Sequence, residues 1–301
     1  MIEHCLYGAQ VLASQTLFTG ALAIGAGSPW DQTPVRLRRG SGAAADRYVE
    51  FVPFVSTHGR ELLLQTDRPI AASVLGQAWC IEVSEVVRFS WFGGEHAVEY
   101  ELLANGTPKL LCFWFVHIVL PMYLTLERGY DFIHASAIDI AGRCAVFIAP
   151  STGGKSTLAD YFLQCGHPLV SDDKVAIFDR EGQYWAVPSH PHHRPYRETE
   201  VLGHPVSNFA SGAMPIAAFF ALEPSEPDSA IELTEVDGFR KFEELSPSYL
   251  YDFEHLRARR LQWLAGLARQ LPVLRLRRPW NLQRQDEVYQ AICQQLTKLR
   301  G

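Results

Sequence analysis

The sequence is poor in several features that would indicate a class of protein by themselves. It has six cysteines in 301 residues, widely scattered and without a Cys-x-x-Cys pair, which leaves no basis for a zinc site, a redox motif or a disulfide framework. It has no basic excess, because 27 lysines and arginines stand against 33 aspartates and glutamates, a net charge of −6. We therefore expect reduced cysteines that serve as small core residues, and no nucleic-acid partner.

Long apolar segments are also scarce. Residues Met1–His4 lack the basic region and the apolar stretch of a signal peptide. The run Leu110–Leu126 carries no charge, but it is shorter than the roughly 20 residues of a membrane span and contains His117 and Pro121. We expect a helix buried in a large core, with Pro121 as a kink or a stop. The chain is thus expected to be cytoplasmic, without membrane contact.

The length and the hydrophobic content of 48% favour two domains with sizeable cores. Residues 1–129 contain short apolar stretches separated by turn residues, which predicts a β-rich N-terminal domain that ends in the buried helix. Residues 130–301 mix apolar strands with helical stretches, which is typical of α/β domains. The clearest expected strands are 48–52, 61–65, 98–102, 144–149, 169–171, 175–178, 184–187, 216–222, 231–236 and 272–277, and the expected helices are 156–165, 251–270 and 283–299.

The strongest chemical signal lies between an expected strand and an expected helix. Residues 149–157 read Ala-Pro-Ser-Thr-Gly-Gly-Lys-Ser-Thr and match the phosphate-loop template, except that Ala149 replaces the first glycine. Two glycines let successive backbone amides face a phosphate, and the helix after the loop adds its dipole. Lys155 would reach the β- and γ-phosphates, and the Ser156 hydroxyl would bind Mg²⁺. The predicted nucleotide-binding residues are Ser151, Thr152, Gly153, Gly154, Lys155, Ser156 and Thr157.

Two carboxylates, Asp172 and Asp173, come directly after the next expected strand. Ligands of open α/β sheets bind outside the carboxyl ends of the strands. One carboxylate there can hold Mg²⁺, directly or through water, and the other can accept the proton of an attacking hydroxyl. The alternative is an Asp-Asp turn that only caps the next element of the chain. The position one helix after a phosphate loop favours the functional interpretation.

A segment rich in histidine and proline, Ser189–Arg197, allows three interpretations. Its histidines could bind a metal, although the prolines and an irregular loop argue against preorganised coordination. It could be a mobile loop that covers nucleotide or peptide, or an inert surface loop. The histidines in question are His190, His192 and His193.

Three arginines lie on an alternating stretch near the C-terminus, namely Arg275, Arg277 and Arg278. One or more of them could stabilise phosphoryl charge or pair with an acidic peptide. A solvated or salt-bridged strand face is the favoured alternative.

Over Phe132–Ile177 the sequence resembles the catalytic domain of the HPr kinase/phosphorylase family. The resemblance consists of His134 leading into a strand, the Gly-Gly-Lys-Ser loop, and a strand that ends in Asp172-Asp173, in the order and spacing of the family. It implies a P-loop core related to phosphoenolpyruvate carboxykinase. It also implies an enzyme that uses ATP and Mg²⁺ to phosphorylate a serine hydroxyl on a small protein.

The same resemblance implies a role for each matching residue. Lys155 and Ser156 would bind ATP and Mg²⁺, Asp173 would be the general base, and Asp172 would be its neighbour on the metal side. His134 would be a polar partner near the base and the transferred phosphoryl group. The family precedent also favours a homo-oligomer.

The departures from the family limit what is carried over. The family loop has glycine and an acidic residue where this chain has Ala149 and Thr157, and no segment matches the one associated with the phosphorylase reaction. The opening Tyr7–Val11 and the overall layout are more similar to the HPr-kinase-like proteins of ribosomal-peptide clusters, which include kinases of lasso-peptide precursors.

The predicted fold is thus α/β, with a β-rich N-terminal domain (1–129) followed by a P-loop HPr-kinase-like catalytic domain (130–301). The predicted function is an ATP- and Mg²⁺-dependent kinase that transfers a phosphoryl group to a hydroxyl, expected to be serine, of a small protein or ribosomally synthesised peptide such as a lasso-peptide precursor. The alternatives are a nucleotide-binding regulatory protein without phosphotransfer and a small-molecule kinase.

Overall fold

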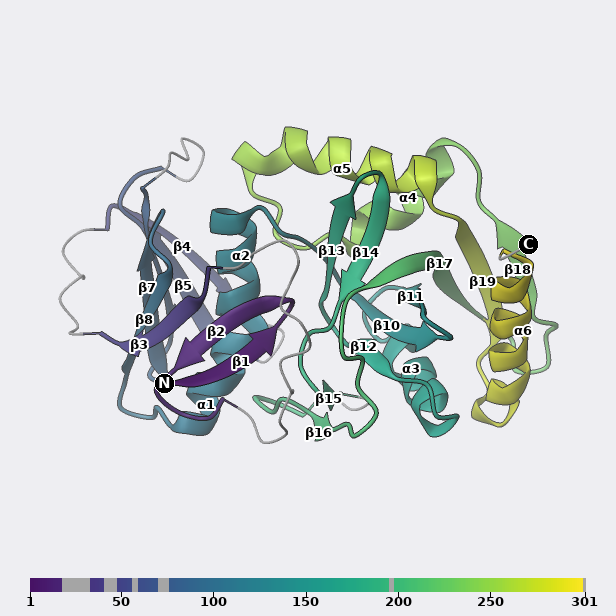
Figure 1. Cartoon of the computed structure of the whole chain (residues 1–301), viewed down its shortest axis with the longest axis horizontal. Helices are drawn as coiled ribbons and strands as arrows, with labels where there is room; N and C mark the ends of the chain where they lie inside the picture. The colour runs from purple at the N-terminus through teal and green to yellow at the C-terminus, as the bar shows by residue number, and fades with distance from the viewer. Residues whose placement is uncertain (18–32, 41–47, 56–58, 70–75, 195–197, 300–301) are drawn as a thin grey trace. The chain divides into compact units, whose positions relative to one another are not determined.

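The structure of the chain is a computed structural model that describes residues 1–17, 33–40, 48–55, 59–69, 76–194 and 198–299. These residues form two units, each with helices and β-sheet, so the chain is mixed α/β (Figure 1). Unit 1 comprises the described residues of the first 130, together with 198–203 and 251–257. Unit 2 comprises the other described residues.

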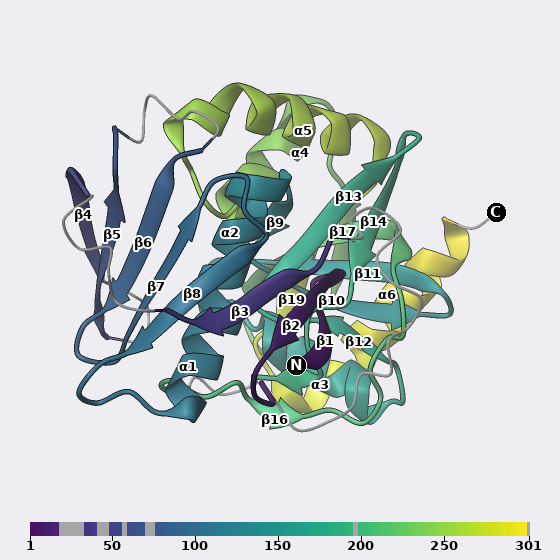
Figure 2. The same ribbon diagram turned by 60° about the vertical axis from the view of Figure 1, so that its left-hand side comes forward.

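Unit 1 is built on one eight-stranded sheet with the strand order β1-β2-β3-β8-β7-β6-β5-β4 (Figure 2). Its strands alternate inward and outward side chains, as in β7, where Val87, Phe89 and Trp91 are buried and Arg88 and Ser90 are half-buried. The strands are β1 (Ile2–Leu6), β2 (Ala9–Ala13), β3 (Val35–Arg39), β4 (Glu50–Val55), β5 (Glu61–Thr66), β6 (Ala78–Val83), β7 (Val87–Phe92) and β8 (Ala97–Leu102).

The apolar face of this sheet packs on the predicted buried helix, which runs over Pro108–Arg128. Phe89 of β7 stacks on Phe115 of the helix, with ring centroids 6.2 Å apart. By length and composition the helix could cross a membrane, but 78% of its most apolar window is buried in the structure. This burial favours a core helix.

The ends of that helix are set by local sequence. Thr107 caps the start, because its side chain accepts from the amide of Leu110 at 3.2 Å, and Pro108 occupies the first turn, where its missing N–H costs nothing. Gly129 ends it in the left-handed conformation (φ 67°).

The expectation that Pro121 kinks or stops the helix needs a correction. A π-helical turn, Phe115–Val119, separates α1 (Pro108–Trp114) from α2 (Leu120–Arg128), and α2 continues through Pro121. Proline has no N–H for the carbonyl four residues earlier, and the wider turn shifts the hydrogen-bond register just before it.

Unit 2 contains a nine-stranded mixed sheet with the main order β12-β10-β11-β17-β14-β13-β9, to which β19 and β18 add beside β17. The strands are β9 (Asp131–Ile133), β10 (Ala135–Ile140), β11 (Arg143–Ile148), β12 (Leu169–Ser171), β13 (Val175–Arg180), β14 (Gln183–Val187), β17 (Met214–Ser225), β18 (Glu232–Glu235) and β19 (Val273–Pro279). A separate two-stranded pair consists of β15 (His192–His193) and β16 (His204–Pro205). The helices are α3 (Lys155–Gln164), α4 (Phe239–Leu245), α5 (Arg257–Gln270) and α6 (Gln285–Lys298).

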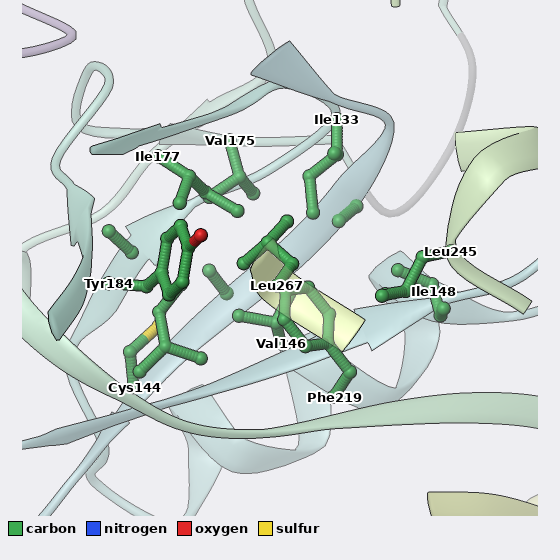
Figure 3. Packing of buried hydrophobic residues seen from close by; sticks show 14 of the residues in the cluster. Ile133, Cys144, Val146, Ile148, Val175, Ile177, Tyr184, Phe219, Leu245 and Leu267 are labelled. Carbon is green, nitrogen blue, oxygen red and sulfur yellow. The ribbon is translucent and has the colours of Figure 1, made fainter. Parts of the chain in front are cut away.

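The central strand β11 is covered on both faces, as its uninterrupted apolar run predicts. Cys144, Val146 and Ile148 belong to a cluster that includes residues of α5 and the β13–β14 hairpin (Figure 3). Phe147 points to the opposite face, where it joins residues of α3 and α6 such as Phe162. This double coverage holds the carboxyl end of β11, where the phosphate loop begins, on a rigid support.

Candidate functional site

Three segments that the sequence singled out converge at one edge of the unit 2 sheet. β10 is antiparallel to both β11 and β12, with Ala135 opposite Ile148 and Ala137 opposite Ser171. The start of β10, preceded by His134, therefore lies beside the ends of β11 and β12. The phosphate loop and the Asp172-Asp173 pair continue directly from those two ends. Carboxyl ends of strands are the usual ligand edge of an α/β sheet.

The loop itself has the tight form that its glycines allow. Gly154 is left-handed (φ 79°), and a Cβ at Gly153 would lie 2.6 Å from the methyl of Ala149, so neither position accepts a side chain without a shift. The φ angle of Ala149 is not positive, so alanine is tolerated there without strain. Its methyl group fits because Gly153 has no side chain to collide with it. The backbone of Thr152 is left-handed (φ 67°). This conformation is uncommon for residues other than glycine and is found more often at functional sites than elsewhere.

Lys155 and the start of α3 supply positive potential inside this loop. The Lys155 ammonium is buried and donates to the carbonyls of Ala149 (2.8 Å) and Pro150 (3.2 Å). Among the described residues no side chain caps the N-terminus of α3, so the amides of its first turn, which includes Ser156 and Thr157, are available to an anion. Ser151 and Thr152 are exposed at the tip of the loop. The predicted nucleotide-binding residues thus lie on one tight loop and on the first turn of α3.

Asp172 is buried and accepts from donors on both of its oxygens. Oδ1 accepts from the hydroxyls of Ser136 (2.6 Å) and Ser156 (3.0 Å) and from the amide of Asp173 (3.1 Å). Oδ2 accepts from the amide of Arg194 at 3.0 Å and lies 2.9 Å from Nδ1 of His193. Burial alone would raise the pKa of Asp172, but these donors outweigh burial and lower it to about 2. Asp172 is therefore a fixed carboxylate that ties the phosphate-loop serine to the sheet edge.

Asp173 has a different environment from its neighbour. Its side chain is 26% exposed, and its backbone is left-handed (φ 73°), which turns the side chain away from the strand direction. Nδ1 of His134 is hydrogen-bonded to the backbone carbonyl of Asp173 at 3.0 Å and lies 3.3 Å from Oδ1, and Oδ2 accepts from the ammonium of Lys174 at 2.8 Å. An accessible carboxylate beside a phosphate loop can take a proton from an incoming hydroxyl. Lys174 was not singled out in the sequence, although it is the residue directly after Asp173.

The structure separates the three arginines near the C-terminus. Arg275 pairs with Glu244 and Arg277 with Glu232, as expected for a salt-bridged strand face. Arg278 points to the opposite face of β19 and is only 5% exposed. This separation could be read from the sequence, because Arg278 has the same strand parity as the apolar Leu276.

Arg278 meets the phosphate loop. Its guanidinium donates to the carbonyl of Gly153 at 3.2 Å, lies over the ring of Trp280, and occupies the space that a Cβ at Gly154 would need. In the part of the chain that the structure describes, no carboxylate lies within ion-pair distance of it, and its Nε has no hydrogen-bond acceptor. Burial lowers the pKa of Arg278, which indicates a cation in a poorly solvated place. An anion at the loop would offset that cost.

The histidine segment is buried over most of its described length and is not an inert surface loop. Over the described residues, no three His, Cys, Asp or Glu side chains are grouped to hold a metal ion. Residues 189–193 are buried, and His193 faces Asp172. Residues 195–197, the end of the segment, lie outside the described ranges. No local signal in the sequence points to the contact of His193 with Asp172, because it depends on how the chain returns after the β13–β14 hairpin.

The side chains at this edge suit Mg²⁺. Ser156 gives its hydroxyl proton to Asp172, so lone pairs of its oxygen remain for a hard cation. Asp172 already accepts from several donors, so contact through Ser156 or through water fits better than direct ligation.

No protein-family model matches the chain, and no curated protein matches it significantly. Among solved structures, the chain is similar to the Hpr(Ser) kinase/phosphatase from Coxiella burnetii, at 12% sequence identity and a TM-score of 0.36. The match covers 56% of this chain and 99% of that chain. It is a distant likeness over about half the chain.

Proposed function

We propose that the chain is an ATP- and Mg²⁺-dependent kinase that transfers the γ-phosphoryl group to a hydroxyl, expected to be serine, of a small protein or ribosomally synthesised peptide such as a lasso-peptide precursor. The observation that carries this proposal is the pair of unlike carboxylates beside the phosphate loop. Asp172 is fixed on Ser156, whereas Asp173 is accessible, with His134 beside its carboxylate and bonded to its backbone carbonyl. A site that only bound nucleotide would not need the second carboxylate.

The positive groups of the site would bind the ATP phosphates. The uncapped first turn of α3, its helix dipole and the Lys155 side chain lie in or directly after the loop. Arg278 braces the loop from the other side and adds a charge in a buried place, where electrostatic interactions are stronger than in water. These groups hold the phosphates in position while charge shifts between oxygens.

Mg²⁺ would be held through Ser156, with Asp172 behind it, and would neutralise charge on the β- and γ-phosphates. Asp173 would accept the proton of the acceptor hydroxyl as that oxygen bonds to the γ-phosphorus and the bond to ADP breaks. His134 would orient Asp173 through its contact with the Asp173 backbone carbonyl, and Lys174 would hold Oδ2 of the carboxylate. Positioning of the reactants and stabilisation of charge would provide most of the rate acceleration.

The acceptor, the cellular location and the assembly rest on sequence reasoning and are part of the proposal. We propose a cytoplasmic enzyme, with unit 1 helping to recognise the peptide or protein substrate. A homo-oligomer, and the absence of nucleic-acid and membrane partners, belong to the same proposal.

The test measures phosphotransfer from γ-labelled ATP, with Mg²⁺, to the peptides encoded beside the gene. We expect label on a serine. Asp173→Asn should reduce the rate by about 10²–10⁴-fold, because removal of a general base costs that much, while ATP binding is kept. The matched control is Asp237→Asn, an exposed aspartate away from the loop, which should transfer at the wild-type rate.

Two results would contradict the proposal. If Asp173→Asn transferred the phosphoryl group at the wild-type rate, the assignment of Asp173 as the general base would be wrong. ATP binding without labelling of any peptide or small hydroxyl compound would favour the regulatory protein, and labelling of a small compound alone would favour the small-molecule kinase.

A further inference from the structure

Asp172 can support Ser156 only if its carboxylate keeps one orientation. Its two oxygens face different groups: Oδ1 faces the hydroxyls of Ser136 and Ser156, and Oδ2 faces His193 and the amide of Arg194. Rotation of the carboxylate would break both sets of contacts together. The hydrogen bond from the Arg194 amide and the close contact of His193 Nδ1, 2.9 Å away, thus act on Oδ2 together, and a change in either would also affect Oδ1.

His193 is placed to do this. It is 3% exposed, with Nδ1 2.9 Å from Asp172 Oδ2 and Nε2 3.6 Å from Asp160 Oδ1 on α3, the helix directly after the phosphate loop. Its backbone is fixed by β15, which pairs with β16 through His193 and His204. The imidazole thus spans the short distance between the carboxylate and the loop helix.

We propose that His193 is a positioning residue that holds Asp172 so that Ser156 presents its oxygen to Mg²⁺. The inference rests on the proposed function and extends it to a segment that no sequence motif assigns. His193 touches neither nucleotide nor metal. It acts through Asp172, as an outer residue that orients the groups nearer to a metal.

The contact has a direction that can be tested. Asp172 is approached by Nδ1, and not by Nε2, of the imidazole. An asparagine at 193 carries its side-chain nitrogen close to the position of Nδ1, whereas a glutamine carries it close to the position of Nε2. A purely structural histidine, needed only for its volume, would not distinguish the two amides in this way.

The experiment measures the Mg²⁺ concentration that half-saturates the binding of a fluorescent ATP analogue. For His193→Phe we expect an increase of about tenfold, as for loss of an outer partner at a metal site. His193→Asn should restore the wild-type value to within about threefold, and His193→Gln should behave like His193→Phe. Binding of the analogue without Mg²⁺ should be the same in all variants.

Controls keep the result interpretable. Asp237→Asn, at an exposed side chain that does not contact His193, should leave the Mg²⁺ dependence unchanged. If His193→Phe does not fold, the comparison of His193→Asn with His193→Gln decides the question, with circular dichroism to establish folding. Equal Mg²⁺ dependence in the asparagine and glutamine variants would overturn the inference.

The outcomes also separate this inference from the proposed function. If the wild type binds the analogue with Mg²⁺ and the His193 variants match it, only the role of His193 is wrong. If the wild type does not bind the analogue at any Mg²⁺ concentration, both proposals are wrong.

Discussion

Arginines on the unit 1 sheet are paired with carboxylates, whereas one buried arginine in unit 2 is not. On the unit 1 sheet, Arg88 lies between Glu82 and Glu101 on the neighbouring strands, at 2.7 and 3.0 Å, and Arg38 faces Glu99 at 2.8 Å. In unit 2, Arg278 is more deeply buried than either of them and, within the described ranges, has a backbone carbonyl and an aromatic ring in place of a carboxylate. Cross-strand ion pairs stabilise a sheet modestly, whereas a buried cation without a carboxylate costs stability. A buried charge without a carboxylate at a phosphate loop therefore indicates anion binding, whereas a charge paired across a sheet indicates structural support.

Among these arginines, Arg278 should give the largest change when its charge is removed. Arg278→Met should weaken Mg·ATP binding about 10- to 100-fold, because a hydrogen bond to a charged group contributes about 1.5–3 kcal/mol. The melting temperature should stay the same or rise, because methionine fills similar volume without a buried charge. Isothermal titration and thermal unfolding measure the two quantities on the same samples.

The matched variant in unit 1 is Arg88→Met. It should leave Mg·ATP binding unchanged. If both variants lowered stability and neither changed binding, the contrast between the two units would be wrong.

A second prediction concerns the dependence of stability on pH, which the buried imidazole of His190 should influence. Burial, followed by the charge of His192, lowers the pKa of His190 to about 3. In the unfolded chain His190 takes up a proton as pH falls below about 6.5, but the folded protein does not until near pH 3. The stability that neutral His190 contributes is thus present above pH 6.5 and is lost as pH falls, by about 1.4 kcal/mol per pH unit.

Urea unfolding at pH 7, 6 and 5 tests this prediction. His190→Asn should flatten the decline in the free energy of unfolding, and the exposed His204→Asn should behave as the wild type does. Parallel declines in all three proteins would contradict the role given to His190.

The smallest effect is expected on the unit 1 sheet. A double-mutant cycle of Arg88→Met and Glu82→Gln should give a coupling of less than about 1 kcal/mol that shrinks with added salt, because both side chains are partly exposed. A coupling of several kcal/mol would mean that this pair is more than sheet support.

The sequence predicted the local parts of the site well and the distant contacts poorly. The apolar run 144–149, the Gly-Gly-Lys-Ser loop and Asp172-Asp173 each carry their own pattern, and the structure has the corresponding strand, loop and strand end at one sheet edge. The expected helix at 251–270 begins later, at Arg257, because residues 251–253 are irregular and 254–256 form a 3₁₀ turn.

Other features depend on tertiary contacts. Helix α4 was missed because, within the described part of the chain, it has no side-chain cap and only Leu245 is buried. The contact of His193 with Asp172 joins residues 21 positions apart, across the β13–β14 hairpin and the irregular segment that follows it. The π-helical turn at Phe115–Val119 leaves no distinct pattern of apolar residues in the sequence, because it differs from an α-helical turn only in the register of its backbone hydrogen bonds. Such features are set by packing and register, which one sequence does not display.

The most direct test of the central claim is the affinity of the protein for Mg·ATP with and without the loop ammonium. We predict that the wild type binds Mg·ATP, that Lys155→Ala weakens binding by about 100-fold or more while remaining folded, and that exposed Lys109→Ala binds as the wild type does. Equal affinity of the wild type and Lys155→Ala would contradict the assignment of this edge as a nucleotide-phosphate site.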